Sequence, residues 1–176
     1  NFEPIGIFEN LIKRMGFESE FSIALDAAAT HFAKNGLYIF DGKRYSTREL
    51  VTIWLRFFAK SSHLTSIEDP FAENDTNGFR ELLQRAKAKI IVGDDLTVTN
   101  PGLIKESGRA KLVNGVIIKP NQIGTITGAK NTASLANAHG LKIIVSHRSG
   151  ETVDDSIAHL AVAWNALMIK TGVKGG

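Results

Sequence analysis

Three acidic residues, each at the end of a short apolar segment, are the first residues in this chain that suggest chemistry. They are Asp26, Glu68 and Asp94. The segment Ile90–Val92, before Asp94, is apolar without alternation, which is typical of a parallel strand buried on both faces. Carboxylates without cysteine or histidine suit a hard cation such as Mg²⁺, which prefers oxygen ligands. We therefore expect the three to bind one Mg²⁺, although their spacing equally allows three unrelated acids in turns.

Basic and polar residues end the next apolar segments of the chain. Lys119 and Lys170 each end one of them, and the tetrapeptide Ser146–Ser149 ends another. Within this tetrapeptide, Arg148 can hold a phosphate or carboxylate through two hydrogen bonds, which predicts an anionic substrate. Two lysines that face one another near a cation both favour the neutral amine. A neutral lysine can act as a general base.

These residues need strands that end at one place and helices that connect the strands. Apolar runs predict six strands, at Phe21–Leu25, Leu64–Ile67, Ile90–Val92, Val116–Ile118, Leu141–Val145 and Leu167–Ile169. Helical spacing and capping residues predict helices at Ile5–Met15, Leu50–Phe58 (after a capping box of Ser46 and Glu49), Gly78–Ala88, from Pro101, Thr125–His139 and Asp154–Asn165. The fold class is therefore α/β. In a closed barrel the strand ends ring one mouth, so the acids would lie on one arc and the bases on the other.

The composition is that of an ordinary globular domain. The chain has 176 residues, of which 43% are hydrophobic and 22% charged, so we expect one domain over residues 1–176. Its net charge of +3 comes from Lys and Arg spread along the chain, which predicts no nucleic-acid partner. The chain has no cysteine, which suits a reducing compartment. No apolar stretch approaches transmembrane length, so we expect no membrane partner and a cytoplasmic location.

The strand ends also carry motifs that resemble enolase, the phosphopyruvate hydratase family. The resemblance covers the chain from about Leu25 to Gly172 and keeps the family's order. The motifs are ALDAAATHF (24–32), SIEDPFAEND (66–75), IVGDDLTVTNP (91–101), IKPNQIGT (118–125), SHRSGET (146–152) and IKTG (169–172). The most specific of them are SHRSGET and GDDLTVTN.

The resemblance implies a role for each of these residues. Asp26, Glu68 and Asp94 look like the Mg²⁺ ligands, and Lys119 looks like the base that takes the proton alpha to the substrate carboxylate. Members of the superfamily use a Lys or His base with one or two Mg²⁺ ions. The residues that the resemblance places against the substrate are Glu68, Asp94, Ser146, His147, Arg148, Ser149 and Lys170.

The resemblance also implies a reaction and an architecture. The reaction is the Mg²⁺-dependent, reversible dehydration of 2-phosphoglycerate to phosphoenolpyruvate in glycolysis, by a cytoplasmic lyase. The substrate is a small phosphorylated carboxylate, and the full-length enzyme is usually a homodimer. The architecture is a TIM-type (β/α) barrel preceded by a small N-terminal domain.

The chain departs from the family by what it lacks. The N-terminal domain, the first barrel strands and the glutamates near the general acid are not in it, and six strands cannot close an eight-stranded barrel. We therefore expect an incomplete C-terminal portion of an enolase. Two alternatives remain: a non-catalytic fragment that binds Mg²⁺ and a phosphorylated acid, or another superfamily member acting on a different carboxylate. The phosphate and carboxylate contacts of SHRSGE and IKTG argue against the second.

Overall fold

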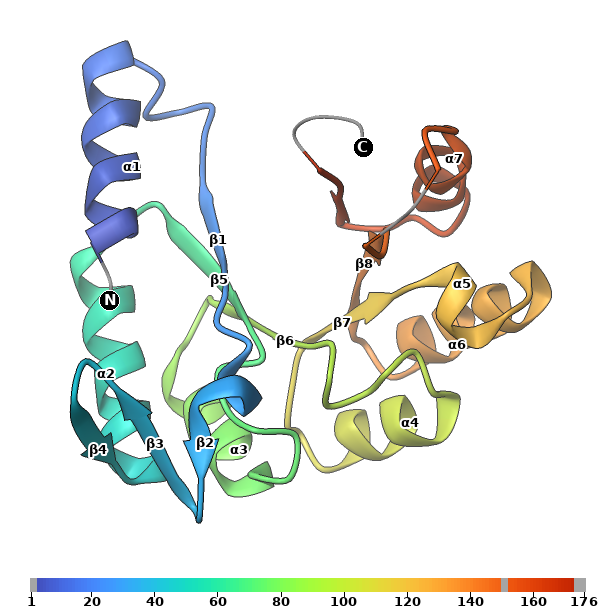
Figure 1. Cartoon of the computed structure of the whole chain (residues 1–176). Coiled ribbons are helices and arrows are strands. Elements are labelled where there is room, and N and C mark those ends of the chain that lie inside the picture. Colours follow the sequence, from blue (N-terminus) through green and yellow to red (C-terminus); the bar gives the residue numbers. More distant parts are fainter. Residues whose placement is uncertain (1–2, 150–151, 173–176) are drawn as a thin grey trace. The chain divides into compact units, whose positions relative to one another are not determined.

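The computed structural model describes residues 3–149 and 152–172 (Figure 1). The chain divides into two compact units, Asn1–Ile91 and Val92–Gly176, and each is described here by itself. The expectation of a single domain over residues 1–176 stays a prediction. Among the described helices, none combines the length and the apolar character needed to span a bilayer.

The first unit contains a parallel strand pair, a small antiparallel sheet and helices that cover them. Its elements are α1 (Glu3–Met15), β1 (Ile23–Asp26), a 3-10 helix η1 (Ala29–Phe32), β2 (Ala33–Lys34), β3 (Leu37–Phe40), β4 (Lys43–Tyr45), α2 (Thr47–Lys60), β5 (Leu64–Glu68), α3 (Thr76–Arg85) and the first half of β6 (Ile90–Gly93). Strands β1 and β5 run parallel, and β5 is next to β6 in the sheet order. Strands β2, β3 and β4 form the antiparallel sheet.

Helix α2 shows how local sequence sets the structure of this unit. The side chain of Ser46 accepts a hydrogen bond from the backbone N–H of Glu49, and the Glu49 carboxylate accepts one from the backbone N–H of Ser46. This reciprocal capping box satisfies donors that a helix start leaves open. The helix packs against α3 and β5. Its apolar side chains Leu50, Val51, Trp54 and Phe58 are buried there.

The second unit is a run of parallel strands separated by helices. After the second half of β6 come α4 (Pro101–Arg109), β7 (Gly115–Ile118), α5 (Pro120–Ile123), α6 (Ile126–Ala138), β8 (Lys142–Ser146), α7 (Ser156–Ala163) and β9 (Met168–Lys170). Strand β7 lies between β6 and β8, and β9 follows β8, with every pair parallel. Every residue of β7 is buried. Parallel strands buried on both faces explain the unbroken apolar runs in the sequence.

The predicted strands and the main helices are confirmed, and the differences are small. Helix α3 starts at Thr76 because Asp75 caps it, accepting a hydrogen bond from the N–H of Gly78. It ends three residues before Ala88, whose φ of 63° is incompatible with a continued helix. The short helix α5, which starts directly after Lys119, was not predicted. Residues 150 and 151, within the predicted motif 146–152, lie outside the described residues.

Candidate active site at the strand ends

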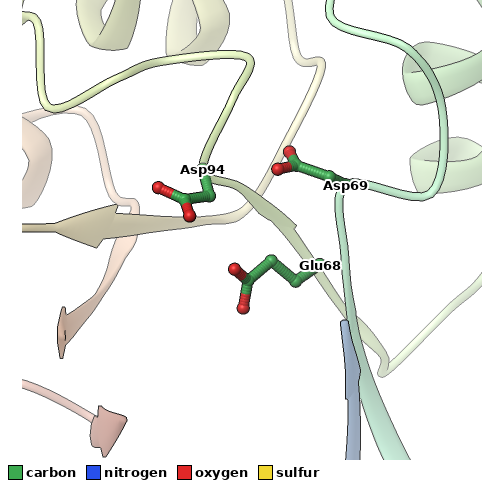
Figure 2. Close-up of side chains that lie close together, drawn as sticks. All are labelled: Glu68, Asp69 and Asp94. Atoms are coloured by element: carbon green, nitrogen blue, oxygen red, sulfur yellow. The ribbon is translucent and has the colours of Figure 1, made fainter. Parts of the chain in front are cut away.

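In the first unit, two carboxylates meet at the end of β5. Glu68 is 8% exposed and Asp69 is 3% exposed, and their carboxylate oxygens lie within 4.8 Å of one another (Figure 2). Two buried negative charges at this separation need cations or hydrogen-bond donors to compensate them. An all-oxygen pair of this kind fits a hard cation such as Mg²⁺.

Asp26 occupies the equivalent position on the neighbouring strand. It ends β1 and lies opposite Glu68 in the parallel register. Its side chain is exposed and accepts a hydrogen bond from the N–H of Ala28 over 3.1 Å. Asp26 is not in the carboxylate group that contains Glu68 and Asp69. The role of Asp26 as a metal ligand therefore stays a prediction, and Asp69, which was not among the predicted ligands, becomes a further candidate.

The backbone around Glu68 and Asp69 is held from several sides. The N–H of Ala27 donates to the carbonyl of Glu68 over 2.9 Å, and the N–H of Ala29 donates to the carbonyl of Asp69 over 3.0 Å. Asp69 has a φ of 40°, in the left-handed region that costs energy for residues other than glycine. The indole N–H of Trp54 donates to the carbonyl of the next residue, Pro70, over 3.0 Å. The segment that carries the two carboxylates is therefore fixed by α2 and by the loop after β1.

In the second unit, the predicted base touches a predicted metal ligand. Lys119 Nζ lies 2.5 Å from Oδ2 of Asp94, and both side chains are mostly buried, with 17% and 12% of their surfaces exposed. Asp94 follows the last residue of β6, and Lys119 follows the last residue of β7. These strands are parallel neighbours, so their carboxyl ends bring the two side chains to one place.

The polar residues that follow β8 lie beside the end of β9. Ser146 is 1% exposed and lies opposite Lys170 in the parallel register, and the N–H of His147 donates to the carbonyl of Lys170 over 3.3 Å. The hydroxyl of Ser146 donates to the carbonyl of His147 over 2.9 Å. Arg148 and Ser149 are exposed on the segment that continues from β8. The strands β6 to β9 thus carry an acid and several bases at the same end of one parallel sheet.

The structure brings together part of the predicted set within each unit. In the second unit, Asp94 lies against Lys119, and Ser146 and His147 lie beside Lys170; all are predicted site residues, but these pairings were not predicted. Sequence reasoning missed Trp54 as a support of the Glu68–Asp69 segment, because a tryptophan on an amphipathic helix is normally read as packing. No local sequence pattern predicts that its indole N–H donates to the carbonyl of Pro70, 16 residues away.

Comparison with known proteins gives a consistent result. Residues 1–175 match the family model described as "Enolase, C-terminal TIM barrel domain". Enolase from Campylobacter jejuni subsp. jejuni serotype O:23/36 (strain 81-176) is 46% identical over 173 residues, which are 98% of this chain and 42% of that protein. Enolase from Ehrlichia ruminantium (strain Gardel) is 45% identical, over 98% of this chain and 41% of that protein. Enolase from Aeropyrum pernix is 42% identical, over 97% of this chain and 40% of that protein. The chain spans about two fifths of the length of these curated relatives.

Proposed function

Because this chain belongs to the family of the enolase C-terminal TIM barrel domain, we propose that the full-length protein is a Mg²⁺-dependent lyase. Membership in this family confirms the predicted fold class, which is a TIM-type barrel. The described part of the chain contains only part of the strands of such a barrel. The proposed reaction is the reversible dehydration of 2-phosphoglycerate to phosphoenolpyruvate. The observation that carries the proposal is the contact between Lys119 Nζ and Asp94, 2.5 Å apart at the ends of adjacent parallel strands.

Lys119 takes the proton from the carbon alpha to the substrate carboxylate. The electron pair of the broken C–H bond moves into the carboxylate, which becomes a dianion. The electron pair of the dianion then forms the double bond between the alpha carbon and the next carbon, while the C–O bond to the hydroxyl on that next carbon breaks. The leaving hydroxyl takes a proton from a general acid, which we expect outside this chain, and departs as water. An ion pair with Asp94 requires the ammonium form of Lys119. That form is the one Lys119 has after taking the proton, and the one from which the reverse reaction starts.

Asp26, Glu68 and Asp94 are the proposed Mg²⁺ ligands. A bound Mg²⁺ would supply concentrated positive charge, which stabilises the carboxylate dianion. The chemistry of the donor set supports this choice, since Glu68 and Asp94 are buried carboxylates that each offer an oxygen ligand. Without a cation at the substrate, removal of a weakly acidic carbon-bound proton would be far too costly.

The residues after β8 and β9 bind the anionic parts of the substrate. Arg148 and Ser149 hold the phosphate, because a guanidinium can donate two hydrogen bonds to it. Lys170, with Ser146 and His147 beside it, faces the carboxylate end. We further propose a homodimeric enzyme that works in the cytoplasm, as part of glycolysis.

A second candidate function rests on the share of the relatives that this chain covers. It aligns with about two fifths of their length, and we expect the general acid outside the part that it covers. The 176-residue chain by itself would then bind Mg²⁺ and a phosphorylated acid without turnover. Calorimetry on this chain distinguishes the cases: heat of binding without product supports this function, and absence of binding contradicts it.

The test of the main proposal is the formation of the enol product by the full-length protein. Its ultraviolet absorbance is followed with 2-phosphoglycerate, with Mg²⁺ and after chelation of Mg²⁺. We expect turnover that stops on chelation and returns when Mg²⁺ is added back. Absence of turnover at saturating substrate and Mg²⁺ would contradict the proposal.

A further inference from the structure

The loop between β6 and α4 contains two consecutive residues in the left-handed region of backbone conformation. Val98 has a φ of 41° and Thr99 a φ of 54°. Both side chains are branched at Cβ, and such residues adopt a positive φ only at an energetic cost. Backbone strain of this kind persists where the surrounding structure enforces it, and it gathers at functional sites. The pair raises the question of which contacts enforce the strain.

Thr99, in this left-handed conformation, makes two hydrogen bonds through its hydroxyl. Its side chain is buried, with 1% of the residue exposed. Its Oγ1 accepts a hydrogen bond from the backbone N–H of Lys119 over 3.0 Å and donates one to Oε1 of Gln122 over 2.7 Å. The N–H of Gln122 in turn donates to the carbonyl of Lys119 over 3.0 Å. Thr99 and Gln122 therefore hold the backbone of Lys119 at both its N–H and its carbonyl.

The same loop also holds the partner of Lys119. The carbonyl of Asp94 accepts hydrogen bonds from the N–H of Thr97 over 3.1 Å and from the N–H of Val98 over 2.7 Å. One short segment thus fixes the backbone of Asp94 at one end and, through Thr99, the backbone of Lys119 at the other. Both partners of the contact between Asp94 and Lys119 are therefore attached to this segment through their backbones.

We propose that Thr99 is a positioning residue for the base Lys119, acting through the Lys119 backbone N–H. The inference rests on the proposed function, in which Lys119 takes the substrate proton. Thr99 is suited to this role because a hydroxyl both accepts and donates, so Gln122 orients the lone pair toward Lys119. Valine has nearly the same shape and offers neither function. A base displaced by about 1 Å can lose on the order of 100-fold in rate.

The test compares Thr99→Val with Thr99→Ser in the full-length protein. We expect Thr99→Val to lower kcat by about 10- to 100-fold with KM nearly unchanged, because Thr99 acts through the base and not on substrate binding. Thr99→Ser keeps the hydroxyl and should restore most of kcat. The matched control is Thr132→Val. Thr132 is also 1% exposed, and its hydroxyl donates to the carbonyl of Gly128 within α6, so kcat should stay unchanged.

A second measurement tests the hydrogen bond between the Lys119 N–H and the Thr99 hydroxyl and does not require turnover. Hydrogen exchange at the backbone N–H of Lys119 should be faster in Thr99→Val than in the wild type and in Thr132→Val. Should Thr99→Val fail to fold, Gln122→Leu removes the acceptor that orients the Thr99 hydroxyl and should also lower kcat.

The outcomes separate this inference from the function on which it rests. A wild-type protein that turns over, with kcat and Lys119 exchange unchanged in Thr99→Val, overturns the inference and leaves the function intact. A wild-type protein without turnover overturns the proposed function and the catalytic role of Thr99 with it. Loss of kcat in Thr99→Ser as large as in Thr99→Val also overturns the inference, since the hydroxyl would then not matter.

Discussion

Lys119 Nζ lies 2.5 Å from Oδ2 of Asp94, so the ends of the adjacent strands β6 and β7 are joined by an ion pair. The pair is mostly buried, and charges in such a position are retained only when they compensate one another. One partner is the proposed base and the other a proposed metal ligand. The contact therefore joins the residue proposed to remove the substrate proton to a residue proposed to bind the Mg²⁺ that stabilises the resulting negative charge.

Asp94→Asn should weaken Mg²⁺ binding by the full-length protein. The substitution keeps the size of the side chain and removes the negative charge, so we expect a loss of about 10- to 100-fold or more in affinity. Titration calorimetry with Mg²⁺ alone measures it. Asp95→Asn is the matched control, because Asp95 is the adjacent residue but is exposed. Equal Mg²⁺ affinity in the wild type and Asp94→Asn would show that Asp94 is not a ligand.

Arg148→Ala should raise the KM for 2-phosphoglycerate. Hydrogen bonds to a charged group contribute roughly 1.5–3 kcal/mol, which corresponds to an increase of about 10- to 150-fold. The value of kcat should change much less, because Arg148 is proposed to hold the phosphate and not the reacting carbon. Steady-state kinetics check both numbers. Arg109→Ala, an exposed arginine in the last turn of α4, is the control and should leave KM unchanged. A KM that stays at the wild-type value in Arg148→Ala would place the phosphate elsewhere.

Tyr38→Phe should destabilise the protein through the loop that follows β5. Tyr38 is 2% exposed, and its hydroxyl donates to Oδ2 of Asp75 over 2.8 Å and accepts from the N–H of Ala72 over 3.1 Å. The variant leaves that buried N–H without its acceptor, which costs about 1–3 kcal/mol. Denaturant unfolding measures the loss. Tyr45→Phe is the control, because the described part of the structure records ring stacking on Phe40 for Tyr45 and no hydrogen bond of its hydroxyl. Equal losses in both variants would contradict the prediction.

Tyr38 should also make the stability of the protein depend on pH in the alkaline range. Burial raises the pKa of Tyr38 well above its ordinary value, and the hydrogen bond to Asp75 and the charge of Asp75 raise this pKa further. The folded state therefore keeps the phenol neutral at a pH where the unfolded state ionises it. The contribution to stability is full below about pH 10 and decreases as the pH rises above that value. Tyr38→Phe should lack this decrease, so the difference in unfolding free energy between wild type and variant should narrow above pH 10. A constant difference across this range would contradict it.

Two helical glycines should respond to alanine with opposite signs. A Cβ at Gly78 would lie 2.6 Å from a ring atom of Phe71, which is fully buried. Gly78→Ala should therefore cost about 1–3 kcal/mol of stability by overpacking. At Gly6, in α1, no atom lies within 4 Å of the added Cβ. Gly6→Ala should stabilise the protein by about 0.5–1 kcal/mol, because alanine favours the helix. Chemical denaturation of both variants checks the signs.

Much of the fold could be predicted because its determinants are local. The apolar runs of β6, β7 and β8 are continuous in the sequence because parallel strands are buried on both faces. The Ser46–Glu49 capping box and the Asn100–Pro101 start of α4 are also local signals, and the structure contains both. The contact of Asp94 with Lys119 follows from strand order, because residues after adjacent parallel strands emerge at one end of the sheet.

What could not be predicted depends on contacts distant in the sequence. Thr99 reaches the backbone of Lys119, 20 residues further along, and Tyr38 reaches the loop at Ala72, 34 residues further along. Neither residue type nor spacing encodes such a hydrogen bond. Asp69 was not among the predicted ligands. Its backbone is left-handed, with a φ of 40°, and no local pattern predicts that conformation at an aspartate.

The exchange of the substrate's alpha hydrogen with solvent deuterium tests most directly whether Lys119 is the base. The full-length wild type, Lys119→Ala and the exposed control Lys111→Ala are incubated with 2-phosphoglycerate and Mg²⁺ in deuterated water, and magnetic resonance follows the hydrogen on carbon 2. We predict exchange in the wild type and in Lys111→Ala, and a rate lower by about 10²- to 10⁴-fold in Lys119→Ala, which should still bind the substrate. Exchange at the wild-type rate in Lys119→Ala would contradict the account.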